Sequence, residues 1–461
     1  MKAILLALAL LPGQDDPVRK LVERLGSDDP AEREQATKDL VKIGRKALPL
    51  LEEAARSGDV ERAARANEAI RRITKIAFRG GDLFAGRRES KGDSVLQAGG
   101  GRETEDAVLH ALKWLSRHQG ADGSWGARTH VEECGKHPRY AGGSCEAPRS
   151  VPEDFDAGVT GLAVLAFTGA GFSHLSKDTY DGVSFGDVVR KGVQWIMSKQ
   201  DPEGCLASRN AQKYMYSHAT AALALAEAYA MSGSRLLVDQ AQKAADFTVA
   251  AQNRGKGWRY SFRCGDNDTS VTFWAAWGLF VARKAGLRVP DAALEGARAW
   301  VEEVTEEAYG RVGYTHKGTG KVFVPGLNEN FDHHESLTAM GALVRMAAGG
   351  RLGEPQVTMG LDLLLRDKPS WGRNSTDFYY WHLGTMAMFQ HDGPEGRRWK
   401  AWNEDVKKAL IENQRLAGAG CETGSWAPVG RWCGEGGRVY ATAINALTLE
   451  TYYRYRLVAP P

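Results

Sequence analysis

A motif that recurs along most of the chain is the strongest constraint on its fold. The segment from His110 to Trp125 reads HALKWLSRHQGADGSW, and the segment from Lys191 to Leu206 reads KGVQWIMSKQDPEGCL. Both place Trp, an aliphatic residue, Gln, Gly and an apolar residue at the same spacing. Weaker copies lie at about 243–258, 297–314, 360–371 and 410–426. Related segments at regular intervals indicate a repeat architecture, in which each unit packs against its neighbours.

Between the copies lie stretches that are apolar on nearly every side. They are rich in Ala, Gly and Thr and occupy 158–170, 217–231, 270–285, 335–348, 376–390 and 439–455. A helix that is apolar all round is buried all round, whereas the motif-bearing helices carry Lys, Arg and Glu on one face. We therefore expect an all-α fold with a ring of inner helices inside a ring of outer helices, an alpha-alpha toroid ((α/α)6 barrel), over residues 104–461.

The residues before this ring divide into three parts. Met1-Lys2, an apolar run and Pro12-Gly13-Gln14 are typical of a secretory signal peptide over residues 1–14, and a short cytosolic helix is the alternative. Helix starts at Asp29 and Asp59 predict a HEAT-like helical module over 15–76 that docks a protein partner or caps the ring. Residues 77–103, rich in Gly, Arg, Lys and Ser, predict a flexible linker.

The charge balance narrows the choice of partners. The chain has 60 Lys and Arg against 57 Asp and Glu, and its basic residues are scattered, which argues against a nucleic-acid binder. No later stretch has the ~18 uncharged apolar residues of a transmembrane helix. Together with the signal peptide, this predicts a secreted or periplasmic protein.

Six cysteines behind a signal peptide predict disulfides. We expect three pairs: Cys134 with Cys145, Cys421 with Cys433, and Cys205 with Cys264. A zinc site made of His130, Cys134, His137 and Cys145 is the alternative for the first pair, although its spacing fits no common zinc pattern.

The Gln-x-x-x-Gly-x-Trp copies resemble the QW motifs of squalene cyclases and the related repeats of protein prenyltransferases. Stretches such as Gly257-Trp-Arg-Tyr, Phe378-Tyr-Tyr-Trp and Gly436-Gly-Arg-Val-Tyr are similar to those of secreted bacterial proteins with squalene cyclase and prenyltransferase-type repeats. The resemblance covers about 104–456 and implies the alpha-alpha toroid of the terpenoid cyclase and protein prenyltransferase superfamily. It implies a fold, whereas function depends on the site.

Class II terpene cyclases protonate an alkene with an acidic Asp in an Asp-x-Asp-Asp motif, which makes Asp266 and Asp268 the catalytic candidates here. The chain reads Asp266-Asn267-Asp268-Thr269. If the motif begins at Asp266, Thr269 replaces its last Asp. If Thr269 is the anchor of the alignment, Asn267 occupies the position of the acid. The resemblance therefore does not carry proton-initiated cyclisation to this chain. An ordinary helix N-cap is the alternative role for Asp268 and Asp377.

The starts of the inner helices should meet at one end of the ring, where helix dipoles and side chains can bind a ligand. The ligand-binding residues expected there are Asp156, Tyr216, His218, Trp274, Tyr380, Arg438 and Tyr440.

Prenyltransferases bind zinc near inner-helix starts through Asp, Cys and His. By this resemblance Asp332, His334 and His382 form a candidate zinc set, and zinc is the one cofactor that the chain suggests. No Cys occupies the matching place, so thiol activation is not implied. A polar helix cap is the alternative for the Asp-His-His stretch.

We expect the cavity to bind an apolar ligand, terpenoid or lipid-like, and the sequence does not decide whether the protein is an enzyme. The alternative is a non-enzymatic extracytoplasmic binding or scaffold protein for glycan, peptide or protein partners. An aromatic cavity favours the first function and a polar cavity the second.

Overall fold

The computed structural model describes residues 17–27, 29–55, 57, 59, 61–63, 65–66, 68–70, 82–87, 91–140, 142–148, 154–317, 335–351, 353–372, 375–416 and 418–458. Two compact units divide the chain, residues 1–79 and 80–461. The stretch assigned to a signal peptide, 1–14, lies outside the described residues.

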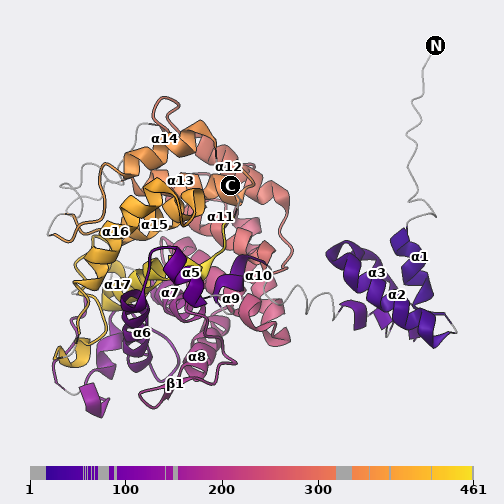
Figure 1. Ribbon diagram of the computed structural model, residues 1–461, viewed down its shortest axis with the longest axis horizontal. Helices are drawn as coiled ribbons and strands as arrows, with labels where there is room; N and C mark the ends of the chain where they lie inside the picture. The colour runs from indigo at the N-terminus through magenta and orange to yellow at the C-terminus, as the bar shows by residue number, and fades with distance from the viewer. Residues whose placement is uncertain are drawn as a thin grey trace. The chain divides into compact units, whose positions relative to one another are not determined.

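The first unit is a small helical cluster with a core of its own. It contains α1 (Pro17–Arg24), α2 (Pro30–Ile43), the 3-10 turn η1 (Gly44–Ala47) and α3 (Leu48–Ala54) (Figure 1). Helix α2 begins at the expected place, because the Asp29 carboxylate accepts the Ala31 amide at 2.8 Å and Pro30 occupies the first turn. The buried core includes Leu25, Ala36, Leu40, Leu51, Ala66 and Ala69.

The second unit consists of paired outer and inner helices. The outer helices are α6 (Arg102–Arg117), α8 (Phe185–Ser198), α10 (Arg235–Ala251), α12 (Asp291–Glu303), α14 (Pro355–Leu364) and α16 (Arg397–Ile411). The inner helices are α7 (Asp156–Gly169), α9 (Tyr214–Ser232), α11 (Thr269–Lys284), α13 (Ser336–Ala347), α15 (Phe378–Asp392) and α17 (Cys433–Leu449). Every residue of α7 from Ala157 to Gly169 is buried, as expected for a helix that is apolar on all sides.

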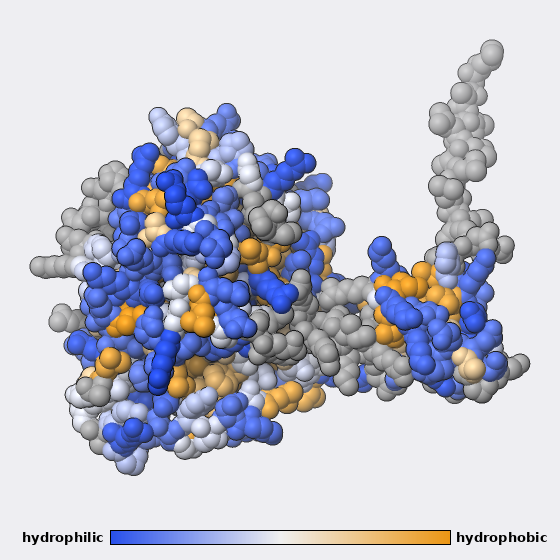
Figure 2. Space-filling view, viewed as in Figure 1, coloured by the Kyte–Doolittle hydropathy of each residue, from blue (hydrophilic) through white to orange (hydrophobic). Residues whose placement is uncertain are grey.

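The inner helices form a closed ring. Each contacts the next along the chain, and α17 returns to contact α7. The outer helices cover them, and the face of this unit in Figure 2 is mostly hydrophilic with scattered apolar side chains. The predicted all-α toroid is therefore confirmed. The last inner helix differs in its bounds: Gly437, with φ of 63°, interrupts it near its start, and α18 (Thr451–Arg454) follows as a separate short helix.

A Gln in four copies of the motif makes the same pair of hydrogen bonds among the described residues. Its side-chain amide donates to a carbonyl of its own loop and to a carbonyl of the next outer helix. These acceptors are Gly123 and Val188 for Gln119, Gly204 and Gln240 for Gln200, Lys256 and Ala293 for Gln252, and Gly424 and Ala107 for Gln414, at 2.6–3.3 Å. Since Ala107 lies in α6, the last of these pairs joins the end of the ring to its beginning.

In three copies the Trp of the motif joins its loop to the preceding outer helix. The indole N–H groups of Trp125, Trp258 and Trp426 donate to carbonyls of the preceding outer helix at 2.7–2.8 Å. All three side chains are fully buried. The motif is thus structural, as its chemistry predicts.

Replacing Gln414 by Ala tests the ring-closing pair. We expect the free energy of unfolding to fall by about 1–3 kcal/mol, because the buried carbonyls of Ala107 and Gly424 each lose the hydrogen bond that the Gln414 amide donates. Urea unfolding followed by circular dichroism measures the change. Gln194→Ala, at an exposed position of outer helix α8, is the matched control and should cost less than about 0.5 kcal/mol. Equal losses in the two variants would contradict the assigned role.

The predicted linker is partly an ordered element of the toroid. Within it, η2 (Asp82–Arg87) and α5 (Lys91–Gln97) are helical and contact α18. The cause is Arg87, whose guanidinium is buried and donates to Glu227 Oε2 at 2.7 Å and to the Arg454 carbonyl at 2.6 Å. Glu227 also pairs with Arg454 Nη2 at 3.0 Å. Local composition indicated flexibility, but a buried ion pair across 140 residues orders the segment.

The Glu227 carboxylate gives this network a pH dependence. Burial by itself raises its pKa, but Arg454 and Arg87 outweigh that effect and lower the pKa to about 2. Because the folded pKa lies below the ordinary value of about 4.3, the ionised group stabilises the fold at higher pH, and this contribution is lost as the pH falls from about 4.5 to about 2.

Glu227→Gln keeps the shape of the side chain and removes its charge. At neutral pH we expect the variant to be less stable by about 3–5 kcal/mol, since two buried guanidinium groups lose their counter-ion. The deficit should shrink as the pH falls from about 4.5 to about 2. Urea unfolding over this range measures it, with the exposed Glu295→Gln of α12 as control. A deficit that does not change with pH would contradict the ion-pair origin.

Candidate functional site

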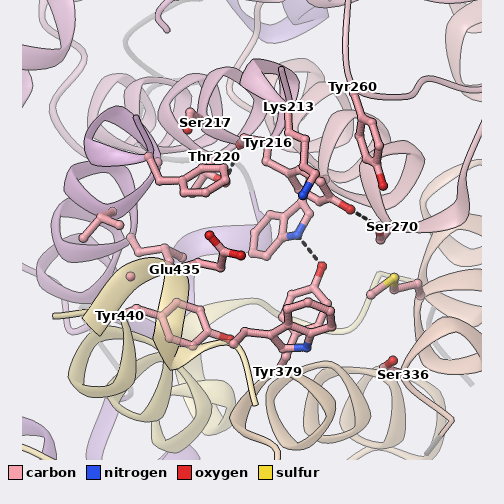
Figure 3. A pocket seen from close by; sticks show the side chains of 18 of the residues that line it. Lys213, Tyr216, Ser217, Thr220, Tyr260, Ser270, Ser336, Tyr379, Glu435 and Tyr440 are labelled. Atoms are coloured by element: carbon pink, nitrogen blue, oxygen red, sulfur yellow. Dashed lines mark hydrogen bonds between the residues drawn. The ribbon is translucent and has the colours of Figure 1, made fainter. Parts of the chain in front are cut away.

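A cavity of about 200 Å³ lies where the first turns of the inner helices meet. Its lining includes Phe155 and Val159 at the start of α7, Tyr216 of α9, Trp274 of α11 and Met340 of α13. The remaining wall comes from α15 and α17 and from two loops (Figure 3). The starts of the inner helices therefore meet at one end of the ring, as expected, and enclose a cavity.

Aromatic rings dominate the wall of the cavity. The aromatic residues among the described lining are Phe155, Tyr216, Tyr260, Trp274, Tyr314, Tyr379, Trp432 and Tyr440. Burial raises the pKa of tyrosines in this wall, including Tyr314 and Tyr379, so they remain protonated phenols at neutral pH.

Several polar groups of the wall are paired with one another. Tyr260 and Tyr314 share a hydrogen bond between their hydroxyls at 2.6 Å. The Trp274 indole donates to the Tyr379 hydroxyl at 2.7 Å, and Tyr216 is hydrogen-bonded to Ser270. These bonds pair part of the wall's polar groups, whereas the Ser217 hydroxyl, the Trp432 indole N–H and the Tyr440 hydroxyl are buried without a hydrogen-bond partner among the described residues.

Two charged side chains join the aromatic wall. Figure 3 shows Glu435 and Lys213 reaching toward the cavity from α17 and from the start of α9. The Lys213 ammonium lies 5.8 Å from the centre of the Tyr260 ring.

Three of the predicted ligand-binding residues lie in this wall: Tyr216, Trp274 and Tyr440. The others lie elsewhere. Tyr380 points the other way from its neighbour Tyr379, and its hydroxyl donates to the Leu364 and Asp367 carbonyls. Successive helix positions face about 100° apart, so a choice between neighbouring tyrosines depends on a helix rotation that sequence does not define.

Asp156 and Arg438 hold loops rather than line the cavity. The Asp156 carboxylate accepts the Ala127 amide at 3.0 Å. Arg438 is buried, with its guanidinium 2.7 Å from Glu422 Oε1 and 3.1 Å from Ser425 Oγ. Both contacts join an inner helix to a motif-bearing loop.

His218 belongs to the repeat rather than to the cavity. In other repeats a Thr of the inner helix accepts the backbone amide of the residue at the motif Trp position; Thr160, Thr272, Thr338 and Thr442 do so at 3.0–3.4 Å. In the second repeat, His218 Nδ1 accepts the Leu206 amide at 3.2 Å. Burial lowers the pKa of His218 to about 3, so the ring is neutral and suited to accept this bond.

The two catalytic candidates have different surroundings. Asp266 is exposed. Asp268 is buried and caps α11, because its Oδ1 accepts the Val271 amide at 2.8 Å and the Ser270 hydroxyl at 3.0 Å. It does not line the cavity, and Ser270 stands between it and Tyr216. Asp377 likewise accepts the Tyr380 amide as the cap of α15, so the N-cap alternative is confirmed for both residues.

The sequence did not predict the cavity residues Tyr260 and Tyr314, although they occupy equivalent positions in two repeats. Tyr260 follows Trp258 by two positions, and Tyr314 follows Val312 by two. Trp258 and Val312 occupy the same place in their repeats, since both donate their backbone amides to a Thr of the next inner helix. Alignment of the repeats would therefore have paired the two tyrosines.

The predicted zinc set is only partly described. Asp332 and His334 lie outside the described residues. His382 is buried in α15 with its Nδ1 3.2 Å from Thr448 Oγ1, and burial lowers its pKa to about 3. His382, which is the member of the set that the structure describes, is therefore buried between inner helices.

The cysteines differ from their predicted pairing. All six lie within the described residues and are free thiols, so the structure contains none of the three predicted disulfides. Cys134 and Cys145 do lie together, but Cys421 and His118 join them, and these four side chains can hold a metal ion. Of the alternative zinc set, Cys134 and Cys145 belong to this cluster, whereas His130 packs against Trp114 and His137 against Tyr140.

No family model matches the chain, and no curated protein matches it. Among solved structures, the GH76A alpha-1,6-mannanase from Salegentibacter sp. HEL1_6 is similar, with a TM-score of 0.48, 10% identity, and coverage of 76% of this chain and 98% of that one. The type II terpene cyclase MstE from Scytonema has a TM-score of 0.47 and 12% identity, covering 76% of this chain and 97% of that one. The assignment of the toroid rests on the helix contacts of this chain itself.

Burial raises the pKa of Asp268 to about 6, although the helix amides, Ser270 and Arg259 oppose the shift. The unfolded value is about 3.9, so folding favours the protonated form and the contribution of Asp268 to stability falls as the pH rises from about 4 to about 6. Asp268→Asn keeps a capping oxygen and cannot titrate. We expect the stability of the wild type relative to this variant to fall by up to about 3 kcal/mol over this window.

Urea unfolding of both proteins between pH 4 and pH 7 measures this difference. Asp266→Asn, at the exposed neighbouring carboxylate, is the control and should show no such trend. A difference between wild type and Asp268→Asn that is constant with pH would contradict the prediction.

Proposed function

We propose that the protein binds a small apolar molecule of terpenoid or lipid type, with one polar group, in the cavity at the inner-helix starts. The observation that carries the proposal is the aromatic wall of this cavity. Aromatic faces bind apolar chains by burial and dispersion, and they bind a positive centre through their quadrupoles. The hydroxyls of Tyr260 and Tyr314 already share one hydrogen bond, so a ligand does not have to supply that bond.

The size of the cavity limits the ligand. An apolar cavity of about 150 Å³ holds benzene, so about 200 Å³ accommodates a short isoprenoid or one end of a longer chain. The Glu435 and Lys213 side chains provide the polar contact for a terminal hydroxyl or carboxyl group.

The proposal is for binding rather than for proton-initiated cyclisation. A residue that protonates an alkene has to be a strong acid in contact with the substrate. Asp266 is exposed, and Asp268 caps a helix outside the cavity wall with a pKa raised by burial to about 6. Neither carboxyl group meets both requirements.

Binding is tested by titrating the full chain with geraniol and farnesol while recording tryptophan fluorescence, since Trp274 and Trp432 line the cavity. We expect saturable binding that Trp274→Ala weakens about tenfold or more, equivalent to about 1.4 kcal/mol. Trp195→Ala is the matched control, because Trp195 lies on outer helix α8 and bonds Asp122 rather than lining the cavity.

Two results would overturn the proposal. One is the absence of saturable binding to either isoprenoid by the folded protein. The other is unchanged affinity in Trp274→Ala. Saturable binding of an oligosaccharide such as mannotriose in place of the isoprenoids would instead support the glycan-binding alternative.

A further inference from the structure

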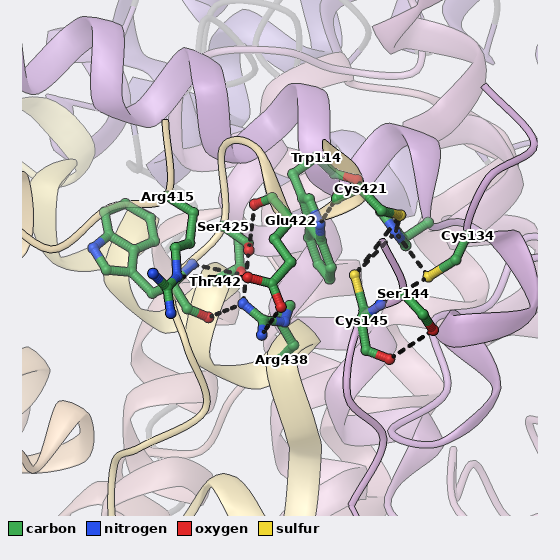
Figure 4. Close-up of polar contacts among 12 residues, drawn as sticks. Trp114, Cys134, Ser144, Cys145, Arg415, Cys421, Glu422, Ser425, Arg438 and Thr442 are labelled. Carbon is green, nitrogen blue, oxygen red and sulfur yellow. Dashed lines mark hydrogen bonds and ion pairs between the residues drawn. The ribbon is translucent and has the colours of Figure 1, made fainter. Parts of the chain in front are cut away.

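Four side chains from distant parts of the chain meet where the last repeat adjoins the first. His118 follows the last residue of α6, and Cys134 and Cys145 lie in the loop that leads to α7. Cys421 lies in η5 (Gly420–Glu422), after the last outer helix, 303 residues from His118. Figure 4 shows the three cysteine side chains gathered on one side of η5.

The distances in this cluster are close to those between the ligands of one ion. His118 Nε2 lies 3.2 Å from Cys421 Sγ, 3.5 Å from Cys145 Sγ and 3.7 Å from Cys134 Sγ. The sulfurs of Cys145 and Cys421 are 3.9 Å apart, and all four atoms lie within 4.8 Å of one another. A tetrahedron with Zn–S bonds of ~2.3 Å and a Zn–N bond of ~2.0 Å separates its ligand atoms by about 3.5–3.8 Å. Bonded sulfurs would lie only ~2.05 Å apart.

We infer that His118, Cys134, Cys145 and Cys421 form a structural zinc site that joins the first and last repeats of the ring. Three thiolates and an imidazole are a soft ligand set of the kind that selects zinc. Four protein ligands fill the tetrahedron and leave no position for substrate or water, which is the mark of a structural rather than a catalytic site.

The surroundings of the cluster orient its ligands. His118 Nδ1 is 2.9 Å from the Trp114 carbonyl, so the ring directs its other nitrogen, Nε2, toward the cysteines. The Trp114 ring stacks on the imidazole at 4.1 Å between ring centres. The Cys145 amide donates to Cys134 Sγ at 3.4 Å and so holds the two cysteines side by side. Partners of this kind fix the orientation of metal ligands.

The segment that carries Cys421 is held against the first repeat by bonds that do not depend on an ion. The Trp114 indole donates to the Cys421 carbonyl at 3.0 Å, and Arg117 donates to the Thr423 carbonyl at 2.7 Å. From the other side, Arg438 of α17 pairs with Glu422 at 2.7 Å (Figure 4). The ligands are therefore brought together by the fold. A bound ion would add a further cross-link between the first and last repeats of the ring.

A cross-link at this place is effective because it spans nearly the whole ring. Closing a longer loop removes more conformational freedom from the unfolded chain, as it does for a disulfide. Zinc binding to preorganised ligands likewise contributes its binding free energy to the folded state. The site is separate from the proposed ligand cavity, since none of its four residues lines that cavity.

The metal content of the full chain tests the inference. The protein is purified under reducing conditions without chelator and dialysed against Zn²⁺, and its zinc is then measured by plasma mass spectrometry. We expect about one zinc per chain in the wild type. Content should fall to background in Cys421→Ser and in the double variant Cys134→Ser/Cys145→Ser. Cys264→Ser, at an exposed cysteine outside the cluster, is the matched control and should keep its zinc.

Measurements on the wild type keep the test independent of how the variants fold. Cobalt in place of zinc should give the visible absorption of a tetrahedral thiolate site, and a chelator should lower the melting temperature of the wild type. Reduced wild type that binds no zinc or cobalt, or full zinc content in a folded Cys421→Ser protein, would overturn the inference. Peptide mapping that finds a disulfide between two of the three cysteines in the native protein would also overturn it.

Discussion

Helices that are apolar on every side have to be enclosed on every side, and this constraint determines the architecture of the second unit. A row of such helices leaves its two end members exposed. A closed ring does not, because α17 packs against α7 and the outer helices cover the rest. The repeated Gln contacts serve the same end, since each ties one outer helix to the next, and Gln414 ties the last to the first through the Ala107 carbonyl. The fold therefore depends on the contacts that join the last repeat to the first, here called the join.

The join is correspondingly rich in buried polar contacts. The Trp114 indole and the Arg117 guanidinium hold the carbonyls of the Cys421 segment, and Arg438 pairs with Glu422. Elsewhere in the unit, the Glu227 carboxylate binds Arg87 and Arg454, which ties the chain before the first repeat to the chain after the last. The guanidinium groups of Arg438, Arg87 and Arg454 are stable in the interior because each has a carboxylate within hydrogen-bond distance. The proposed zinc site would add a metal to the same join.

The cavity follows from the same geometry. Parallel inner helices bring their starts to one end of the ring, where backbone N–H groups need caps and side chains converge. Asp268 and Asp377 meet the need for caps. The aromatic residues of the next turns, such as Tyr216, Trp274 and Tyr379, then form the wall. This division of labour explains why the acidic residues stabilise helices while the aromatic residues face the proposed ligand.

The sequence by itself determined the ring, because the period of the motif and the all-round apolarity of the alternate helices are local properties that admit one arrangement. Of the seven ligand-binding residues that it predicted near the inner-helix starts, Tyr216, Trp274 and Tyr440 line the cavity. Only the tertiary structure decided between Tyr379 and Tyr380, because that choice depends on helix rotation. Only it showed that Arg87 orders the expected linker and that Cys421 meets His118 rather than Cys433. Contacts across hundreds of residues are set by ring closure, and spacing along the chain contains no trace of which segments that closure brings together.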